Sequence, residues 1–338
     1  MIEVLHTGAL STVQDMGRLG CLRWGVGTAG AMDRLALAAG NILLGNDETC
    51  AAIEVQVFPL RLRFLADCDF ALTGADGDAR LDGLPLLPWS AHRARAGQEL
   101  YVGLPRLCPA RTSRSYLCLP GGVDVPAVLG SRSTQMRGAF GGLEGRPLRN
   151  GDRLRAAAGE PARLARFHGL VPPEQALPLW VDGQRALRVL PAAEYDKYTA
   201  ESRAAFWRNP WKITLQSDRY GYRLAGEVPL QPLAALEMRS HGIVPGVIQV
   251  PPDGQPIVQM RDGQPTGGYP KLGTVIEADL WRLGQAPIGE RVRFVETDWQ
   301  GALDALEETQ AWLQEARRQV ALYATLDGAL GGAKEARA

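Results

Sequence analysis

Short segments that alternate polar and apolar residues recur along this chain, and turns rich in glycine and proline separate them. Residues 61–64 and 67–70 alternate in this way, and residues 247–250 and 257–260 flank a Pro-Pro-Asp-Gly-Gln turn. A period of two is typical of half-buried strands. With 39 glycines and 23 prolines among 338 residues, the pattern favours β-barrels or sandwiches over a doubly wound parallel sheet.

Three segments are predicted to be helical. Asp33 can cap a helix that ends at Gly45, because a carboxylate at this position accepts a hydrogen bond from the first turn. A second helix is predicted over about residues 193–207, before Pro210. The longest, over residues 299–326, has leucines in a stripe at helical spacing.

A weak internal repeat predicts two related β domains. Thr-Val-Gln at residues 12–14, followed by Arg-Leu-Gly, is echoed by Thr-Leu-Gln at residues 214–216, followed by Arg-Tyr-Gly. A proline-rich linker over about residues 159–178 separates the two halves. The predicted organisation is an N-terminal domain over residues 1–160, a C-terminal domain over 180–298, a helix over 299–326 and a disordered tail over 327–338.

Composition excludes several classes of protein. Lys+Arg and Asp+Glu both number 37, so the chain lacks the positive charge of a nucleic-acid binder. No apolar run approaches the roughly 18 residues of a membrane span, and the acidic start does not resemble a signal peptide. We therefore expect a cytoplasmic protein. The five cysteines form no C-x-x-C pair and only four histidines occur, so reduced thiols and no metal site are predicted.

Two polar motifs bounded by glycines stand out, one in each half. The first covers residues 12–20 and contains Gln14, Asp15 and Arg18, and the second covers residues 265–271 and ends at Lys271. Neither contains a cysteine or histidine, so they indicate a site that binds a small polar molecule by hydrogen bonds. The chain has no P-loop, no G-x-S-x-G elbow, no H-E-x-x-H and no Ala-Met-Lys-Met biotin sequence.

Motifs in register along nearly the whole chain resemble one family, the biotin-dependent carboxyltransferase-type family. It includes the C subunit of 5-oxoprolinase, the antikinase partner proteins and allophanate hydrolase subunit 2. The chain departs from the usual family pattern at Tyr220, His241 and Pro265, where Met, Glu and Thr are common. The matching segments are residues 14–18, 30–33, 41–46, 72–76, 121–126, 129–134, 141–146, 217–224, 248–251 and 266–270.

The resemblance implies a mainly β fold with two cyclophilin-like β-barrel domains in tandem, a few short helices and a C-terminal helix. It also implies partners, here proteins like the B and A subunits of 5-oxoprolinase. The family's substrates are small amides, which need hydrogen-bond donors at the carbonyl oxygen and acceptors at N–H. ATP is the expected cofactor of the complex, and no covalent biotin is expected on this chain.

Cationic donors would stabilise the charge that develops on an activated amide oxygen, so Arg18, Arg132 and Lys271 are the candidate catalytic residues. We expect the polar loops of both halves to converge on one cleft between the barrels. The candidate substrate-binding residues are Gln14, Asp15, Asp33, Asn46, Ser133, Thr134, Arg219, Arg223, Gln249, Thr266, Gly267, Gly268 and Tyr269.

Each candidate also has a structural interpretation. Gln14 and Asp15 can close a loop through hydrogen bonds to backbone, Asp33 can cap a helix, and Asn46 can end one. Arg219 and Arg223 can form salt bridges that join the two domains. These alternatives stay open from sequence alone.

The function predicted from sequence is that of a component of an ATP-dependent 5-oxoprolinase, which opens 5-oxo-L-proline to L-glutamate and is inactive without its partners. Two alternatives remain. One is a regulatory partner of a kinase-inhibitor protein, and the other is a biotin-dependent carboxyltransferase component of the urea or allophanate pathway. The sequence does not discriminate among them, nor does it indicate which component of the complex binds ATP.

Overall fold

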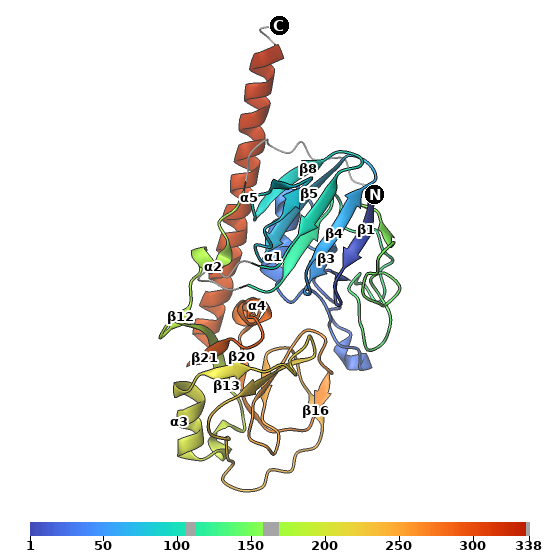
Figure 1. Ribbon diagram of the computed structural model, residues 1–338. Coiled ribbons are helices and arrows are strands. Elements are labelled where there is room, and N and C mark those ends of the chain that lie inside the picture. Colours follow the sequence, from blue (N-terminus) through green and yellow to red (C-terminus); the bar gives the residue numbers. More distant parts are fainter. Residues whose placement is uncertain (106–111, 158–168, 336–338) are drawn as a thin grey trace. The chain divides into compact units, whose positions relative to one another are not determined.

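The computed structural model describes residues 1–105, 112–157 and 169–335, with side chains described up to residue 326. The fold is mainly β, with short helices and one long C-terminal helix, as predicted (Figure 1). Cys108, one of the thiols expected to be reduced, lies outside the described residues. No helix in the described part of the chain is both long and apolar enough to cross a membrane.

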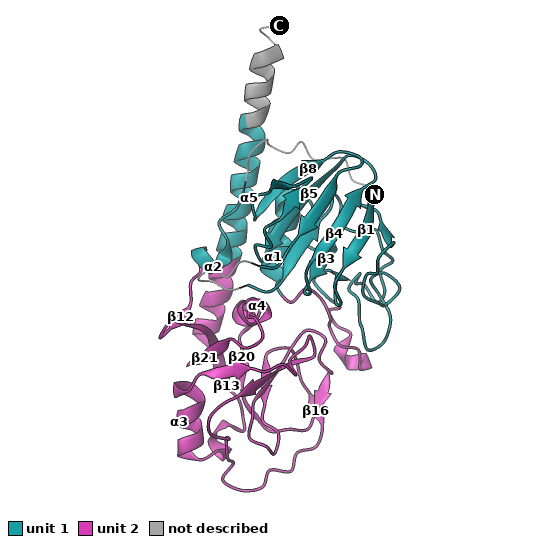
Figure 2. Ribbon diagram, viewed as in Figure 1, with its two compact units in different colours: residues 1–17, 33–176, 310–338 teal, residues 18–32, 177–309 magenta. Residues whose placement is uncertain are grey.

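The chain divides into two compact units (Figure 2). Unit 1 contains residues 1–17, 33–176 and 310–338, and unit 2 contains residues 18–32 and 177–309. These bounds differ from a simple division into residues 1–160 and 180–298, because the segment 18–32 belongs to unit 2. Met32 is part of the unit 2 core, which explains why this early segment is not part of unit 1.

Unit 1 contains two antiparallel sheets. The six-stranded sheet has the order β11-β1-β4-β9-β6-β7, and the five-stranded sheet has the order β2-β3-β10-β5-β8. The strands are β1 (Ile2–Thr7), β2 (Thr12–Gln14), β3 (Ala52–Val55), β4 (Leu60–Phe64), β5 (Cys68–Gly74), β6 (Arg80–Leu81), β7 (Leu84–Pro85), β8 (Ser90–Ala94), β9 (Glu99–Val102), β10 (Ser115–Cys118) and β11 (Arg153–Leu154).

Apolar side chains from both sheets form one core in unit 1. Leu62 and Phe64 come from β4, and Phe70 and Leu72 come from β5. The alternation at residues 61–64 arises because Leu62 and Phe64 are buried while Arg61 is exposed. Burial of these side chains from both sheets is the main contribution to the stability of this unit.

Unit 2 contains a closed barrel. Its strands follow the order β13-β20-β17-β18-β15-β14-β21, and β21 pairs in parallel with β13 to close the ring. The strands are β12 (Trp180–Val181), which pairs with β13 outside the ring, β13 (Gln184–Pro191), β14 (Trp211–Ile213), β15 (Gly221–Ala225), β17 (Val247–Gln249), β18 (Ile257–Gln259), β20 (Lys271–Val275) and β21 (Arg291–Glu296).

The predicted hairpin of unit 2 is confirmed, since β17 and β18 pair antiparallel around the Pro-Pro-Asp-Gly-Gln turn. A separate two-stranded pair, β16 (His241–Gly242) with β19 (Thr266–Gly267), places His241 opposite Gly267. The second polar motif therefore begins in a small ribbon and ends in barrel strand β20.

The first predicted helix is confirmed, because α1 (Arg34–Leu43) has Asp33 as its N-cap. The second begins later than predicted. Residues 195–197 form the 3-10 helix η2 (Tyr195–Lys197), and α3 (Ala200–Arg208) starts only after Thr199, whose hydroxyl caps it. The last helix, α5 (Trp299–Glu335), continues past residue 326, and residues 336–338 lie outside the described residues.

Four shorter helices complete the described chain. These are η1 (Leu22–Trp24), α2 (Pro173–Ala176), η3 (Glu277–Asp279) and α4 (Leu280–Gln285). Helix α2 lies in the stretch predicted to be a linker, of which residues 159–168 are outside the described residues.

Candidate functional site

Asp15 is the centre of a hydrogen-bond cluster in unit 1. One of its carboxylate oxygens accepts hydrogen bonds from the hydroxyls of Ser131 at 2.6 Å and Ser133 at 2.5 Å, and from the N–H of Gly17 at 2.8 Å. The other oxygen accepts the N–H of Arg132 at 2.5 Å. The carboxylate is buried. These contacts agree with the interpretation that Asp15 closes a loop through hydrogen bonds. They also hold in place the loop that carries Arg132.

The loop presents the Arg132 side chain at the surface. Its Nε donates to the carbonyl of Val125 at 3.0 Å, and the residue is exposed. Among the described residues, no carboxylate forms an ion pair with this guanidinium. Arg132 thus keeps donors for a ligand, whereas its neighbours Ser133 and Thr134 are buried and bonded within the protein.

Arg18 differs from Arg132 in burial. It belongs to unit 2, and its side chain is fully buried. Its backbone N–H donates to the carbonyl of Thr28 at 2.7 Å. A guanidinium without exposed surface has a structural role as well as any role in the reaction, so a substitution here would affect folding.

Three other candidates of unit 1 have structural contacts. Asp33 accepts the N–H of Ala36 at 2.9 Å, as a helix cap does. Asn46 donates to Leu119 and accepts the N–H of Gly121, so its amide joins the end of α1 to a turn. Gln14 is fully buried and donates to the hydroxyl of Thr12. A role for these side chains in substrate binding stays a prediction.

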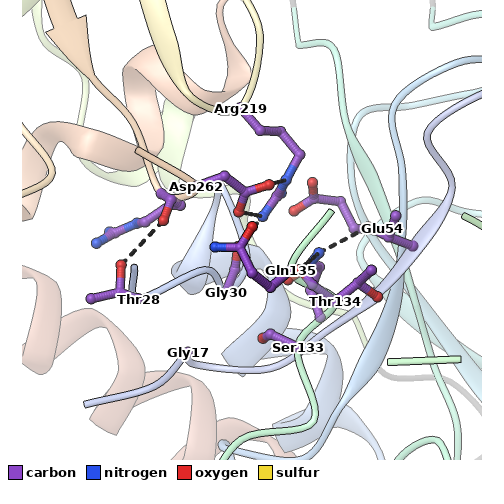
Figure 3. A network of polar contacts seen from close by, with 12 residues as sticks. Gly17, Thr28, Gly30, Glu54, Ser133, Thr134, Gln135, Arg219 and Asp262 are labelled. Carbon is purple, nitrogen blue, oxygen red and sulfur yellow. Dashed lines mark hydrogen bonds and ion pairs between the residues drawn. The ribbon is translucent and has the colours of Figure 1, made fainter. Parts of the chain in front are cut away.

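Arg219 forms a buried bidentate salt bridge with Asp262 in unit 2. Two guanidinium nitrogens donate to the two carboxylate oxygens at 2.9 Å each, and one also donates to the carbonyl of Gly30 at 2.7 Å (Figure 3). Both residues of this salt bridge belong to unit 2, so it is not the predicted link between the two domains. Arg223, on strand β15, is exposed.

Lys271 contacts the side chains of Glu194 and His241. Its Nζ is 3.2 Å from Oε2 of Glu194, and the same oxygen accepts the backbone N–H of Lys271 at 3.2 Å. Nζ is also 2.5 Å from Nε2 of His241. The Lys271 side chain is 16% exposed, so a ligand can reach it. This cluster is the strongest candidate site in unit 2.

Gln249 lies on the strand next to Lys271. The two residues are direct partners in the β17–β20 pairing, so their side chains share one face of the sheet. Nε2 of Gln249 is buried and has no hydrogen-bond partner within the described part of the chain. A Cβ on Gly267 would lie 2.4 Å from this nitrogen, so a larger residue there would displace the Gln249 amide. A buried donor that the protein leaves unsatisfied is suited to a polar group of a ligand.

The second motif places its other residues around this cluster. Thr266 is exposed, Tyr269 is 47% exposed, and Gly268 packs near the hydroxyl of Ser240. The structure thus brings together Gln249, Gly267 and Lys271 within unit 2. Convergence of the loops of both halves on one cleft stays a prediction.

Sequence reasoning missed two members of the cluster, Glu194 and His241. The sequence marks His241 only as a departure from the family pattern, and this departure is the one available signal. Glu194 lies 77 positions from Lys271, and no motif marks it. The described residues contain no group of three or more metal-ligating side chains that could hold a metal ion.

Comparison with known proteins gives long matches. A family model described as the carboxyltransferase domain, subdomain A and B, matches residues 24–296. The C subunit of the 5-oxoprolinase of Escherichia coli (strain K12) is 41% identical over 317 residues, which cover 93% of this chain and 97% of that protein. The protein of the same name from Haemophilus influenzae is 40% identical over 320 residues, covering 95% and 99%.

Urea amidolyases match over only part of their length. That of Lachancea kluyveri is 31% identical over 331 residues, which cover 92% of this chain but 18% of the larger protein. The crystal structure of the K. lactis urea amidolyase superposes with a TM-score of 0.83 at 28% identity, covering 93% of this chain and 20% of that one.

Proposed function

Because the chain belongs to the family of the carboxyltransferase domain, subdomain A and B, we propose that it is the C-type component of an ATP-dependent 5-oxoprolinase. Such a complex opens the lactam of 5-oxo-L-proline to give L-glutamate. One observation carries the proposal. The match to the two bacterial 5-oxoprolinase proteins extends over 97% and 99% of their lengths. The similarity therefore extends over nearly the full length of both relatives.

The proposed enzyme works as a complex. The bacterial relatives are named as C subunits, which implies A and B subunits, and partners of those two types are proposed for this chain. The sequence has no P-loop and no self-contained set of nucleophile and base. We therefore propose that the ATP-dependent reaction requires the assembled complex, in the cytoplasm.

The cluster around Lys271 supports a role in binding the amide. When a lactam carbonyl is activated, negative charge develops on its oxygen, and a fixed cationic donor stabilises that charge. Lys271 offers such a donor and is partly exposed. Gln249 adds a side-chain amide, which can both donate and accept hydrogen bonds. The cis amide of a lactam has the same two kinds of group and can pair with it. Arg132, held at the surface of unit 1, is proposed as a further cationic donor.

A second candidate function has one specific observation in its favour. The fold superposes on the K. lactis urea amidolyase with a TM-score of 0.83 over 93% of the chain. A carboxyltransferase that acts on urea would need biotin carried on another protein, since this sequence has no biotin-attachment motif. The chain matches only 20% of that structure, so most of the amidolyase has no counterpart here.

A substrate panel discriminates between the two functions. The chain would be reconstituted with its A-like and B-like partners and supplied with ATP and either 5-oxo-L-proline or urea with bicarbonate. ATP hydrolysis stimulated by 5-oxo-L-proline supports the proposal. Stimulation by urea alone, dependent on a biotinylated carrier, would replace it with the second candidate.

A further inference from the structure

Glu194 holds Lys271 at two points. Its Oε2 accepts the backbone N–H of Lys271 and forms an ion pair with Nζ, both at 3.2 Å. The two side chains are only 12% and 16% exposed. One carboxylate oxygen therefore restrains both the strand position and the charged end of this lysine, which limits the directions in which its remaining N–H groups can point.

His241 is a second contact of the same ammonium. An ammonium can only donate hydrogen bonds, so Nε2 of His241 must accept one from Nζ of Lys271 at 2.5 Å. The other ring nitrogen, Nδ1, is 3.0 Å from the carbonyl of Arg239, to which it can only donate. Both contacts are satisfied by a single species, the neutral imidazole with its proton on Nδ1.

We propose that Glu194 and His241 are positioning residues that direct the ammonium of Lys271 toward the substrate, and that the need for a neutral His241 makes this positioning depend on pH. The inference rests on the proposed function, in which Lys271 donates to the amide. An ammonium has three N–H donors. His241 takes one and Glu194 faces another, so a third is left for the ligand.

The charges around His241 determine the sign of the pH effect. In the described part of the chain, the ammonium of Lys271 contacts His241, and the carboxylate of Glu194 contacts that ammonium. Tyr198, near Glu194, stays uncharged because burial and the Glu194 charge raise its pKa to about 12. Arg239 is exposed on the segment of His241 itself. A protonated imidazole could not accept from Nζ and would repel it, so acid conditions release Lys271.

Kinetics of the reconstituted 5-oxoprolinase complex test the inference. His241→Gln keeps an acceptor but cannot take up a proton in this range, whereas His241→Leu removes the acceptor. We expect kcat/KM of His241→Gln to stay within about threefold of wild type at pH 8, and that of His241→Leu to fall by roughly tenfold or more. In acid, where the imidazole takes up a proton, kcat/KM of wild type should fall toward that of His241→Leu, whereas kcat/KM of His241→Gln should not.

Two variants serve as controls. His6→Gln removes an exposed imidazole from β1, and Lys212→Ala removes an exposed cation from β14. Both should have the wild-type pH profile.

Glu194→Gln should lower kcat/KM as well, because the ammonium loses its anionic partner. Parallel pH profiles for wild type and His241→Gln would overturn the proposal.

A measurement on the purified chain separates this inference from the proposed function. Nitrogen-15 NMR of the four histidines, with His241 assigned from His241→Gln, reports which ring nitrogen carries the proton. We expect Nδ1 protonation for His241 near pH 8, and loss of this preference in Lys271→Met. Protonation on Nε2 near pH 8 would refute the positioning role even if the complex is active. The expected tautomer in a complex without 5-oxoprolinase activity would refute only the function.

Discussion

The carboxylate of Asp262 accepts two hydrogen bonds, each 2.9 Å long, from the guanidinium of Arg219. The side chains are 1% and 4% exposed. Gly30, in the early segment that belongs to unit 2, accepts a third bond from the same guanidinium. Arg219 therefore joins three parts of unit 2 that are distant in sequence.

Removing Arg219 should destabilise the protein strongly. Arg219→Ala removes the salt bridge of the buried Asp262 carboxylate, and breaking a buried pair typically costs about 3–5 kcal/mol. Chemical denaturation followed by circular dichroism measures this loss. Arg223→Ala, which removes an exposed arginine of β15, should change the free energy of unfolding by less than about 0.5 kcal/mol. Equal effects of the two substitutions would show that the buried salt bridge contributes no more than a surface arginine does.

Asp15 should stabilise the fold through its hydrogen bonds with the hydroxyls of Ser131 and Ser133. Asp15→Ala leaves the buried hydroxyls of Ser131 and Ser133 without this acceptor, and the expected loss is at least about 2 kcal/mol of unfolding free energy. Asp124→Ala, which removes an exposed carboxylate of the same unit, is the matched control. If Asp15→Ala keeps wild-type stability while the complex loses activity, the carboxylate acts on substrate and not on the loop.

The raised pKa of Tyr198 predicts that the folded protein loses stability at alkaline pH. Burial, and next the charge of Glu194, raise its pKa from 10.0 to about 12. The folded state thus favours the neutral phenol, and this contribution is complete below pH 10 and is lost as the pH rises through about 12. Between about pH 10 and 12, the free energy of unfolding of wild type should fall by up to about 2–3 kcal/mol more than that of Tyr198→Phe. The exposed Tyr101→Phe should behave as wild type does, and identical alkaline curves for all three proteins would contradict the prediction.

Lys271 should affect activity far more than stability. Lys271→Ala in the reconstituted complex should lower kcat by roughly 10²–10³, the usual effect of losing a donor to developing charge. The melting temperature should fall by no more than about 3 °C, because the side chain is partly exposed and its ion pair adds little. Lys212→Ala should change neither quantity. A large loss of melting temperature with Lys271→Ala would make this lysine a structural residue.

Much of the local structure could be predicted because its causes are local. Asp33 caps α1 because its carboxylate reaches the N–H three residues later, a spacing visible in the sequence. The turn between β17 and β18 could be predicted for the same reason, because its Pro-Pro-Asp-Gly-Gln residues are contiguous in the sequence. The predicted start of α3 is too early, because Tyr195–Lys197 form a separate 3-10 turn before the Thr199 cap.

The candidate site is harder to predict because its contacts are distant in sequence. The motif identifies Lys271, but its partners Glu194 and His241 come from a loop and a ribbon 77 and 30 positions away. Sequence alone leaves Arg219 as a candidate for substrate binding or for a salt bridge, and the choice depends on Asp262, which is 43 positions away. Only the folded chain shows which polar side chains are paired.

Glutamate formation with components omitted in turn tests the proposed function most directly. The complex of this chain with its A-like and B-like partners should convert 5-oxo-L-proline to L-glutamate with hydrolysis of ATP. Omission of this chain, or of ATP, should abolish the product, and the chain alone should form none. Full glutamate formation by the two partners without this chain, or none by the complete complex, would contradict the proposal that the chain is a component of a 5-oxoprolinase.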